Sequence, residues 1–104
     1  MEKHNTTYLV PVDFTPASES ATKFAIELAE NSKADIILLH VIKSAKDKRQ
    51  AEMEMAAFVE KHAAQYGLLQ TRVIEGSLAD EIHGAAKILQ ADMIVMGTHC
   101  ITGI

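Results

Sequence analysis

Ile36-Ile37-Leu38-Leu39-His40-Val41-Ile42 is a continuous run in which every residue except His40 is apolar. A strand with one solvated face alternates apolar and polar residues, whereas a strand buried on both faces is apolar along its whole length. The run therefore predicts a strand in the interior of a sheet. Strands of this kind are typical of parallel sheets that carry helices on both faces.

The residues before this run predict one more strand and a helix. Residues 8–13 form a short, mostly apolar run that indicates a second buried strand. Pro11 must lie near its carboxyl end, because proline cannot donate to a strand ladder. Pro16 suits the first turn of the helix that follows. Apolar residues then recur at helical spacing, and the predicted buried stripe consists of Ala21, Phe24, Ala25, Leu28 and Ala29.

The residues after the run predict a second helix, which we expect to end before Gly67 as its C′ glycine. Residues 71–75 are more polar and predict a strand at the edge of the sheet. The apolar face of this second helix comprises Met55, Phe58, Val59, His62, Ala63 and Tyr66.

A third helix and a last strand complete the pattern. Ser77 and Asp80 resemble a capping box at the start of the helix. Residues 93–96 form the last apolar run, which ends in Gly97. The predicted buried side of the third helix comprises Leu78, Ile82, Ala85, Ala86 and Leu89.

The order of elements is βαβαβαβ, which predicts a single α/β domain over residues 1–104 with a doubly wound parallel sheet. Right-handed crossovers from a central first strand give the strand order 3-2-1-4. Ligands of such sheets bind outside the carboxyl ends of the strands, at the point where the winding reverses. Asp13 and Gly97 end the two strands that flank this point.

The composition excludes several classes of function. The 104 residues carry a net charge of −4, so no basic surface for nucleic acid or anionic membrane is expected. The single cysteine, Cys100, cannot form an internal disulfide and suits a reducing compartment. No apolar run approaches the ~20 residues that span a bilayer. We therefore expect a cytoplasmic protein.

Few residues offer chemistry, and each has an alternative interpretation. Asp13 could accept hydrogen bonds from a ribose, hold Mg²⁺ through water, or cap the following helix, and Thr15 suits a cap. Gly97-Thr98-His99 could present backbone N–H groups to a phosphate, or could serve only as a turn.

Catalytic and metal sites are not predicted. His40 lies inside a buried strand and is interpreted as a hydrogen-bonded core histidine. His62 and His83 lack a second ligand at i+4, and the adjacent pair His99-Cys100 has poor geometry for zinc. Neither a Gly-x-Ser-x-Gly elbow nor a Walker motif is present. We expect no metal site, and the sequence offers no defensible catalytic constellation, which favours a protein without enzymatic activity but leaves the question open.

Four segments together resemble the universal stress protein family of the UspA type. They are residues 9–15, residues 38–41, residues 73–76 and residues 91–99. The resemblance implies an adenine nucleotide α-hydrolase-like fold with five strands in the order 3-2-1-4-5, usually as a dimer. In one branch of the family it also implies ATP binding.

The resemblance further implies a set of nucleotide contacts. Asp13 would hold the ribose or adenine, Val41 would meet the adenine, and the phosphate loop would begin at Met96. Cys100 stands where the ATP-binding branch has its second glycine, and the third would fall beyond Ile104. The full set of implied cofactor-binding residues is Pro11, Val12, Asp13, Thr15, Val41, Met96, Gly97 and Thr98.

These features lead to two hypotheses about function. The first is a stress-response module that binds an adenine nucleotide weakly, either AMP or ATP with Mg²⁺, at the carboxyl ends of the first and fourth strands. The second is an interaction protein of the same fold that acts through dimerisation and binds no nucleotide. We also expect the domain to be C-terminally incomplete, with the fifth strand missing. The fourth strand would then be an open apolar edge through which the chain self-associates as a homodimer.

Overall fold

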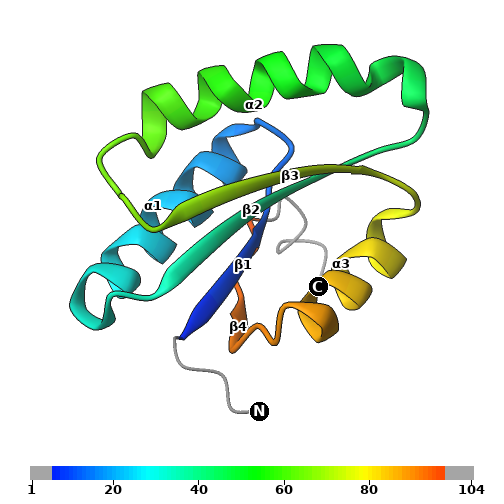
Figure 1. Cartoon of the computed structure of the whole chain (residues 1–104). Coiled ribbons are helices and arrows are strands. Elements are labelled where there is room, and N and C mark those ends of the chain that lie inside the picture. The colour runs from blue at the N-terminus through cyan, green and yellow to red at the C-terminus, as the bar shows by residue number, and fades with distance from the viewer. Residues whose placement is uncertain (1–5, 98–104) are drawn as a thin grey trace, which may run out of the picture.

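The computed structural model describes residues 6–97, and its elements alternate between strand and helix as the sequence predicts (Figure 1). A short 3₁₀ turn, Ala45–Asp47, precedes the second helix. The elements are β1 (Thr7–Pro11), α1 (Pro16–Ser32), β2 (Asp35–Ile42), α2 (Lys48–His62), β3 (Leu69–Glu75), α3 (Leu78–Ile88) and β4 (Met93–Ile94).

The four strands form one parallel sheet in the order β3-β2-β1-β4, which confirms the predicted α/β fold and strand order. β2 lies in the interior and pairs along its length, with Leu9 opposite Ile37 on one side and Val73 opposite His40 on the other. β4 pairs with β1 through only two residues, Met93 and Ile94. The continuous apolar run of β2 therefore reflects its central position.

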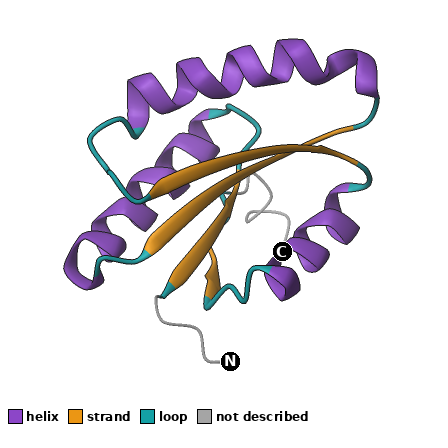
Figure 2. Cartoon of the chain, in the orientation of Figure 1, coloured by secondary structure: helices purple, strands orange, loops and turns teal. Residues whose placement is uncertain are grey.

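The helices cover the two faces of the sheet unequally (Figure 2). Alternate residues of a strand point to opposite faces, and so β1 and β2 supply two separate cores. α1 and α2 pack on the larger core, in which Val10, Ile36 and Leu38 are fully buried. α3 alone packs on the smaller core around Leu9, Ile37 and Leu39.

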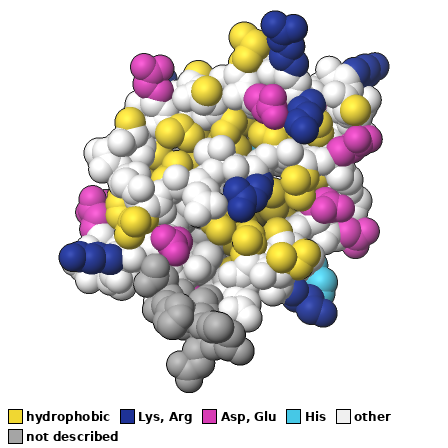
Figure 3. Space-filling model, viewed as in Figure 1, with side chains coloured by type: hydrophobic (Ala, Val, Ile, Leu, Met, Phe, Trp, Pro, Cys, Tyr) yellow, Lys and Arg dark blue, Asp and Glu magenta, His cyan; other side chains and the backbone are white. Residues whose placement is uncertain are grey.

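The single helix α3 leaves part of the sheet face on which it packs uncovered. Figure 3 shows hydrophobic side chains across the middle of the face that is seen in Figure 1, with charged side chains mostly around the rim. Ile88 is 83% exposed, and Leu78 is 56% exposed although we predicted that it would be buried. Leu78 is the first residue of α3 and lines an open groove at the ends of the strands.

Local sequence accounts for the start of α1. Thr15 is the N-cap, its Oγ1 accepts a hydrogen bond from the Ser18 N–H at 3.3 Å, and Pro16 occupies the first helical position, as predicted. Lys33 adopts the left-handed conformation at the other end. Phe24 is 53% exposed, so its prediction as a core residue is wrong: it lies at the border of the stripe, beside β4.

One predicted helix end and one predicted cap are also wrong, although α3 begins after Ser77 as the sequence predicts. α2 ends at His62 rather than before Gly67, because the chain turns at Ala63 and the Tyr66 hydroxyl donates to the Ala34 carbonyl. The Ser77 side chain makes no capping hydrogen bond at the start of α3, so the predicted capping box is not formed.

Candidate functional site

An open groove lies at the carboxyl ends of β1, β2 and β3 and has a volume of about 580 Å³. Three residues that the sequence implied as nucleotide contacts, Val12, Asp13 and Val41, line it together. The lining combines apolar residues with the charged residues Asp13, Lys43 and Glu75. The remaining lining residues are His40, Lys43, Glu75, Gly76, Ser77 and Leu78.

Asp13 is exposed at this groove and is also tied to the first turn of α1. Its Oδ1 accepts hydrogen bonds from the Thr15 N–H at 3.2 Å, the Thr15 hydroxyl at 2.5 Å and the Ser18 hydroxyl at 2.6 Å. A carboxylate at this position interacts favourably with the positive end of the helix dipole. Asp13 therefore takes part in capping α1, and its position at the groove leaves a ligand contact open as well.

Phe14 holds the loop between β1 and α1 in an unusual conformation. Its φ angle is 66°, in the left-handed region that bulky residues seldom occupy. The ring lies 4.4 Å from the His40 ring and 5.7 Å from the Phe58 ring, measured between centroids. Such strain persists where surrounding contacts fix the conformation, and it is common at binding sites.

The side chain of His40 completes the link between this loop and β2. The Val12 N–H donates to the Leu39 carbonyl at 2.8 Å, in continuation of the strand ladder. The Val12 carbonyl lies 2.7 Å from Nδ1 of His40. Because a carbonyl only accepts, Nδ1 carries the proton. This hydrogen bond agrees with the prediction of a hydrogen-bonded histidine at position 40.

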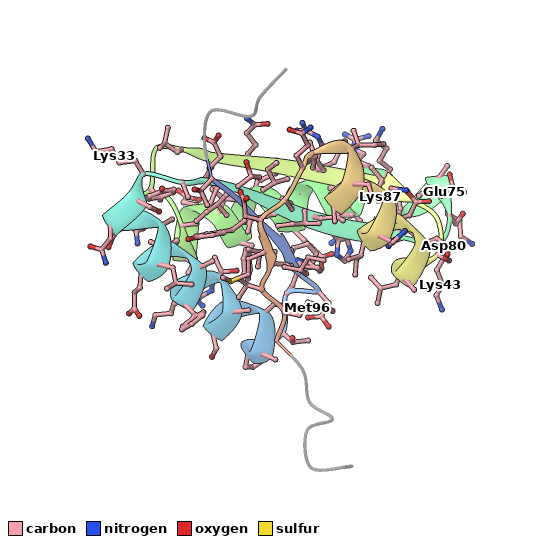
Figure 4. The ribbon with its side chains drawn as sticks, turned by 90° about the horizontal axis from the view of Figure 1, so that it is seen from below. Lys33, Lys43, Glu75, Asp80, Lys87 and Met96 are labelled. Carbon is pink, nitrogen blue, oxygen red and sulfur yellow. The ribbon has the colours of Figure 1, made fainter. Side chains whose placement is uncertain are left out.

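Met96 and Gly97 line a second groove, between α1 and β4, which also has a volume of about 580 Å³. A Cβ atom at Gly97 would overlap the backbone carbonyl of Ala17 in the first turn of α1, so the close approach requires glycine. In Figure 4, Met96 lies beside the start of α1, whereas Lys43, Glu75 and Asp80 lie together near the start of α3. The predicted contacts are thus divided between two grooves.

The structure places the other predicted site residues less directly. Pro11 is buried as the last residue of β1, paired in register with Leu39, and does not line either groove. Thr15 acts as the cap of α1. Thr98 lies outside the described residues, as do His99 and Cys100.

Sequence reasoning missed several residues at the site. Lys43 follows β2 directly, and Gly76 follows β3, so their positions after parallel strands were a usable signal. A Cβ atom at Gly76 would overlap the Glu81 side chain, which explains the need for glycine there. Ser18 gave no such signal, because its contact with Asp13 depends on the geometry of the loop.

Residues 6–97 contain no group of three or more His, Cys, Asp or Glu side chains arranged to hold a metal ion. Among the helices of the same part of the chain, none is both long enough and apolar enough to cross a membrane.

Comparisons with known proteins agree with this fold. A model of the Universal stress protein family matches residues 5–104. The Universal stress protein MJ0531 of Methanocaldococcus jannaschii is 28% identical over 112 residues, which cover 92% of this chain and 66% of that protein. The chain thus spans slightly less than two thirds of this relative.

Solved structures of similar fold include two with bound nucleotides in their descriptions. One is the universal stress protein from Archaeoglobus fulgidus in complex with dAMP, with a TM-score of 0.76, 18% identity, and coverage of 88% of this chain and 79% of that chain. Another is a universal stress protein in complex with cAMP, with a TM-score of 0.69, 22% identity, and coverage of 88% and 71%.

Proposed function

Because the chain belongs to the universal stress protein family, we propose that it is a stress-response module that binds an adenine nucleotide, AMP or ATP, in the groove at the carboxyl ends of β1, β2 and β3. One observation carries the proposal: Val12, Asp13 and Val41, which come from two different strand ends, line a single groove of about 580 Å³. The dAMP and cAMP complexes of two proteins with this fold support the ligand class.

The backbone of Val41 suits the edge of an adenine ring. The N–H and carbonyl groups of successive strand residues point alternately to the two neighbouring strands. The backbone groups of Val41 therefore point to the same side as those of Leu39, whose carbonyl accepts from the Val12 N–H. β1 pairs with β2 only as far as Pro11 opposite Leu39, and Val41 lies beyond that point. Its N–H and carbonyl can therefore pair with a ring nitrogen and with the N6 amino group of adenine.

Asp13 suits the ribose. An ionised carboxylate only accepts hydrogen bonds, and the ribose hydroxyls are donors that it can receive. Glu75 adds a second carboxylate to the lining, and Lys43 is the cation there. Two acidic groups disfavour a bare triphosphate, and we therefore propose that ATP binds only with Mg²⁺ and that AMP binds without it. The proposed phosphate contacts of Met96, Gly97 and Thr98 stay a prediction.

Isothermal titration of the protein with AMP, with ATP and Mg²⁺, and with GMP tests this function. We expect weak binding of the adenine nucleotides, with Kd on the order of 100 µM, and weaker binding of GMP. The guanine edge presents a carbonyl where adenine presents its N6 amino group, so it would face the Val41 carbonyl unfavourably. Absence of heat with AMP and ATP, on protein with a native circular dichroism spectrum, would disprove the proposal.

A second function has its own supporting observation. Met93 and Ile94, which form the edge strand β4, are 43% and 42% exposed, and Phe24 and Met96 beside them are 53% and 48% exposed. Exposed apolar groups along a sheet edge favour association with another chain. We propose as the alternative an interaction protein that forms a homodimer through this edge and binds no nucleotide. A cytoplasmic location stays a prediction for both functions.

A further inference from the structure

We propose that His40 is a positioning residue that keeps the backbone N–H of Val41 available to the nucleotide base. The proposal rests on the nucleotide-binding function proposed above. In this role the His40 side chain makes a hydrogen bond that a backbone N–H would otherwise make. The replacement of one donor by the other can be measured in the protein without any ligand.

The strand ladder defines which group His40 replaces. In a pair of parallel strands, a residue donates its N–H to the carbonyl of one residue on the neighbouring strand. Its own carbonyl accepts from the N–H two positions further along that neighbouring strand. The Val12 N–H donates to the Leu39 carbonyl at 2.8 Å. An extended ladder would therefore bring the Val41 N–H onto the Val12 carbonyl.

The structure shows a different partner for this carbonyl. The register of β1 and β2 ends with Pro11 opposite Leu39, and within the described part of the chain no hydrogen bond joins the Val41 N–H to the Val12 carbonyl. The carbonyl instead lies 2.7 Å from Nδ1 of His40. Because His40 Nδ1 takes the place of the Val41 N–H as the partner of this carbonyl, β1 ends at Pro11, two residues before the end that the sequence predicted.

Contacts around the ring fix His40 in this role. Phe14 lies on it, with 4.4 Å between ring centroids, and Phe14 in turn lies 5.7 Å from Phe58 of α2. His40 also lines the candidate groove together with Val12 and Val41. The ring therefore holds the Val12 carbonyl, while Val41 lines the groove.

The chemical consequence is a ready donor for the base. If the His40 donor is removed, the Val12 carbonyl is left without that partner, and an unpaired carbonyl near the protein interior is costly. The Val41 N–H is the nearest donor in the ladder and would take its place. A nucleotide would then have to break this new bond before it could use the amide, and its affinity would fall.

Three variants separate the donor from the bulk of the ring. His40→Asn places an amide N–H close to the position of Nδ1, His40→Gln places its amide near Nε2 instead, and His40→Leu removes both donors. Amide hydrogen exchange of Val41, measured by NMR on the free protein, reports directly on the proposed exchange of partners. The amide of Leu39, inside the paired register, is the internal reference.

We expect the Val41 amide of the unmodified protein and of His40→Asn to exchange faster than that of Leu39. In His40→Gln and His40→Leu it should exchange about tenfold more slowly than in the unmodified protein, as one added hydrogen bond predicts. AMP titration should show a Kd raised about tenfold in His40→Gln and by much less in His40→Asn. A general loss of stability would not slow the exchange of one amide, so the sign of the effect is specific.

The outcomes distinguish this inference from the function on which it rests. Equal Val41 exchange in the unmodified protein and His40→Gln would overturn the positioning role, even if AMP binds. If the amides exchange as expected but AMP does not bind, the nucleotide function is overturned. The change of hydrogen-bond partner at the Val12 carbonyl is then still supported. If His40→Leu does not fold, the pair His40→Asn and His40→Gln still decides the question.

Discussion

Ser18 and Asp13 are joined by two hydrogen bonds in opposite directions. The Ser18 Oγ accepts from the Asp13 N–H at 2.8 Å and donates to Asp13 Oδ1 at 2.6 Å. Ser18 is 4% exposed, whereas Asp13 is exposed at the groove. The serine thus holds both the backbone and the carboxylate of Asp13 against the first turn of α1.

The change Ser18→Ala removes both hydrogen bonds and leaves the Asp13 N–H without this acceptor. We expect the free energy of unfolding to fall by about 1–3 kcal/mol, the net contribution of two hydrogen bonds of which one is made to a charged group. Urea denaturation followed by circular dichroism measures this loss. Ser20→Ala, an exposed position on the same helix, is the control and should change stability by less than about 0.5 kcal/mol.

The change Asp13→Asn tests the proposed ribose contact. Hydrogen bonds to an ionised acceptor are stronger than those to a neutral amide, so we expect the Kd for AMP to rise about tenfold. Calorimetric titration measures the effect. Glu60→Gln removes one negative charge from an exposed position on α2 and controls for the change in net charge. Equal affinity in Asp13→Asn and the control would argue against Asp13 as a ligand contact.

Gly97→Ala and Gly84→Ala should have opposite effects on stability. A Cβ atom at Gly97 would overlap the Ala17 carbonyl, which belongs to the backbone and cannot rotate away. We expect a loss of about 1–3 kcal/mol from this overpacking. At Gly84, within α3, a Cβ atom would meet no heavy atom within 4 Å, so alanine should stabilise the helix by about 0.5–1 kcal/mol. Thermal unfolding of the two variants would contradict the structure if both moved in the same direction.

We expect the protein to lose stability in alkaline solution, where the Tyr66 hydroxyl ionises. Burial, and then the negative charges of Asp35 and Glu30, raise the pKa of its hydroxyl above the ordinary value of 10.0. The unfolded chain therefore loses this proton first as the pH rises. The contribution of the protonated Tyr66 hydroxyl to the free energy of unfolding is fully present below pH 10. It is lost as the pH rises through the raised pKa of Tyr66. Urea midpoints between pH 8 and pH 11, compared with those of Tyr66→Phe, should converge at the alkaline end. A constant difference between the two proteins would refute this linkage.

Ile94→Lys tests the alternative function. A lysine on the edge strand opposes pairing with another chain, because its charge would be buried in the contact. Sedimentation velocity over a range of concentrations should show association of the unmodified protein and a monomer for the variant. Met53→Lys, at an exposed position on α2, is the control and should leave association unchanged. A monomer at every concentration without substitution would exclude the edge as a dimer interface.

Much of the fold could be predicted because its strongest signals are local. The continuous apolar run of β2 reflects burial on both faces, and the strand order follows from the doubly wound pattern, in which right-handed crossovers start from a central first strand. Helix ends were less predictable: α2 stops at His62 because of a tertiary contact of Tyr66, not because of Gly67. Helical spacing located the stripe on α1 but not its width, and so it did not show that Phe24 lies outside the core.

The site was predictable as a position and less so as an arrangement. Sequence placed Asp13, Val41 and Gly97 near strand ends, where parallel sheets bind ligands. It could not show that Gly97 faces a different groove from the other two. The hydrogen bond from His40 to the Val12 carbonyl joins residues 28 positions apart, and no spacing rule predicts it.

The two edges of the sheet have different consequences for assembly. β3 presents the exposed residues Gln70, Thr71 and Arg72, whereas β4 presents Met93 and Ile94. Two copies that meet through β4 would use the same surface on each, related by a twofold axis. Such an isologous contact closes on itself, and the polar edges of β3 would face outward and resist further addition. If the proposed association through β4 takes place, the asymmetry of the sheet therefore predicts a closed pair rather than a growing fibre.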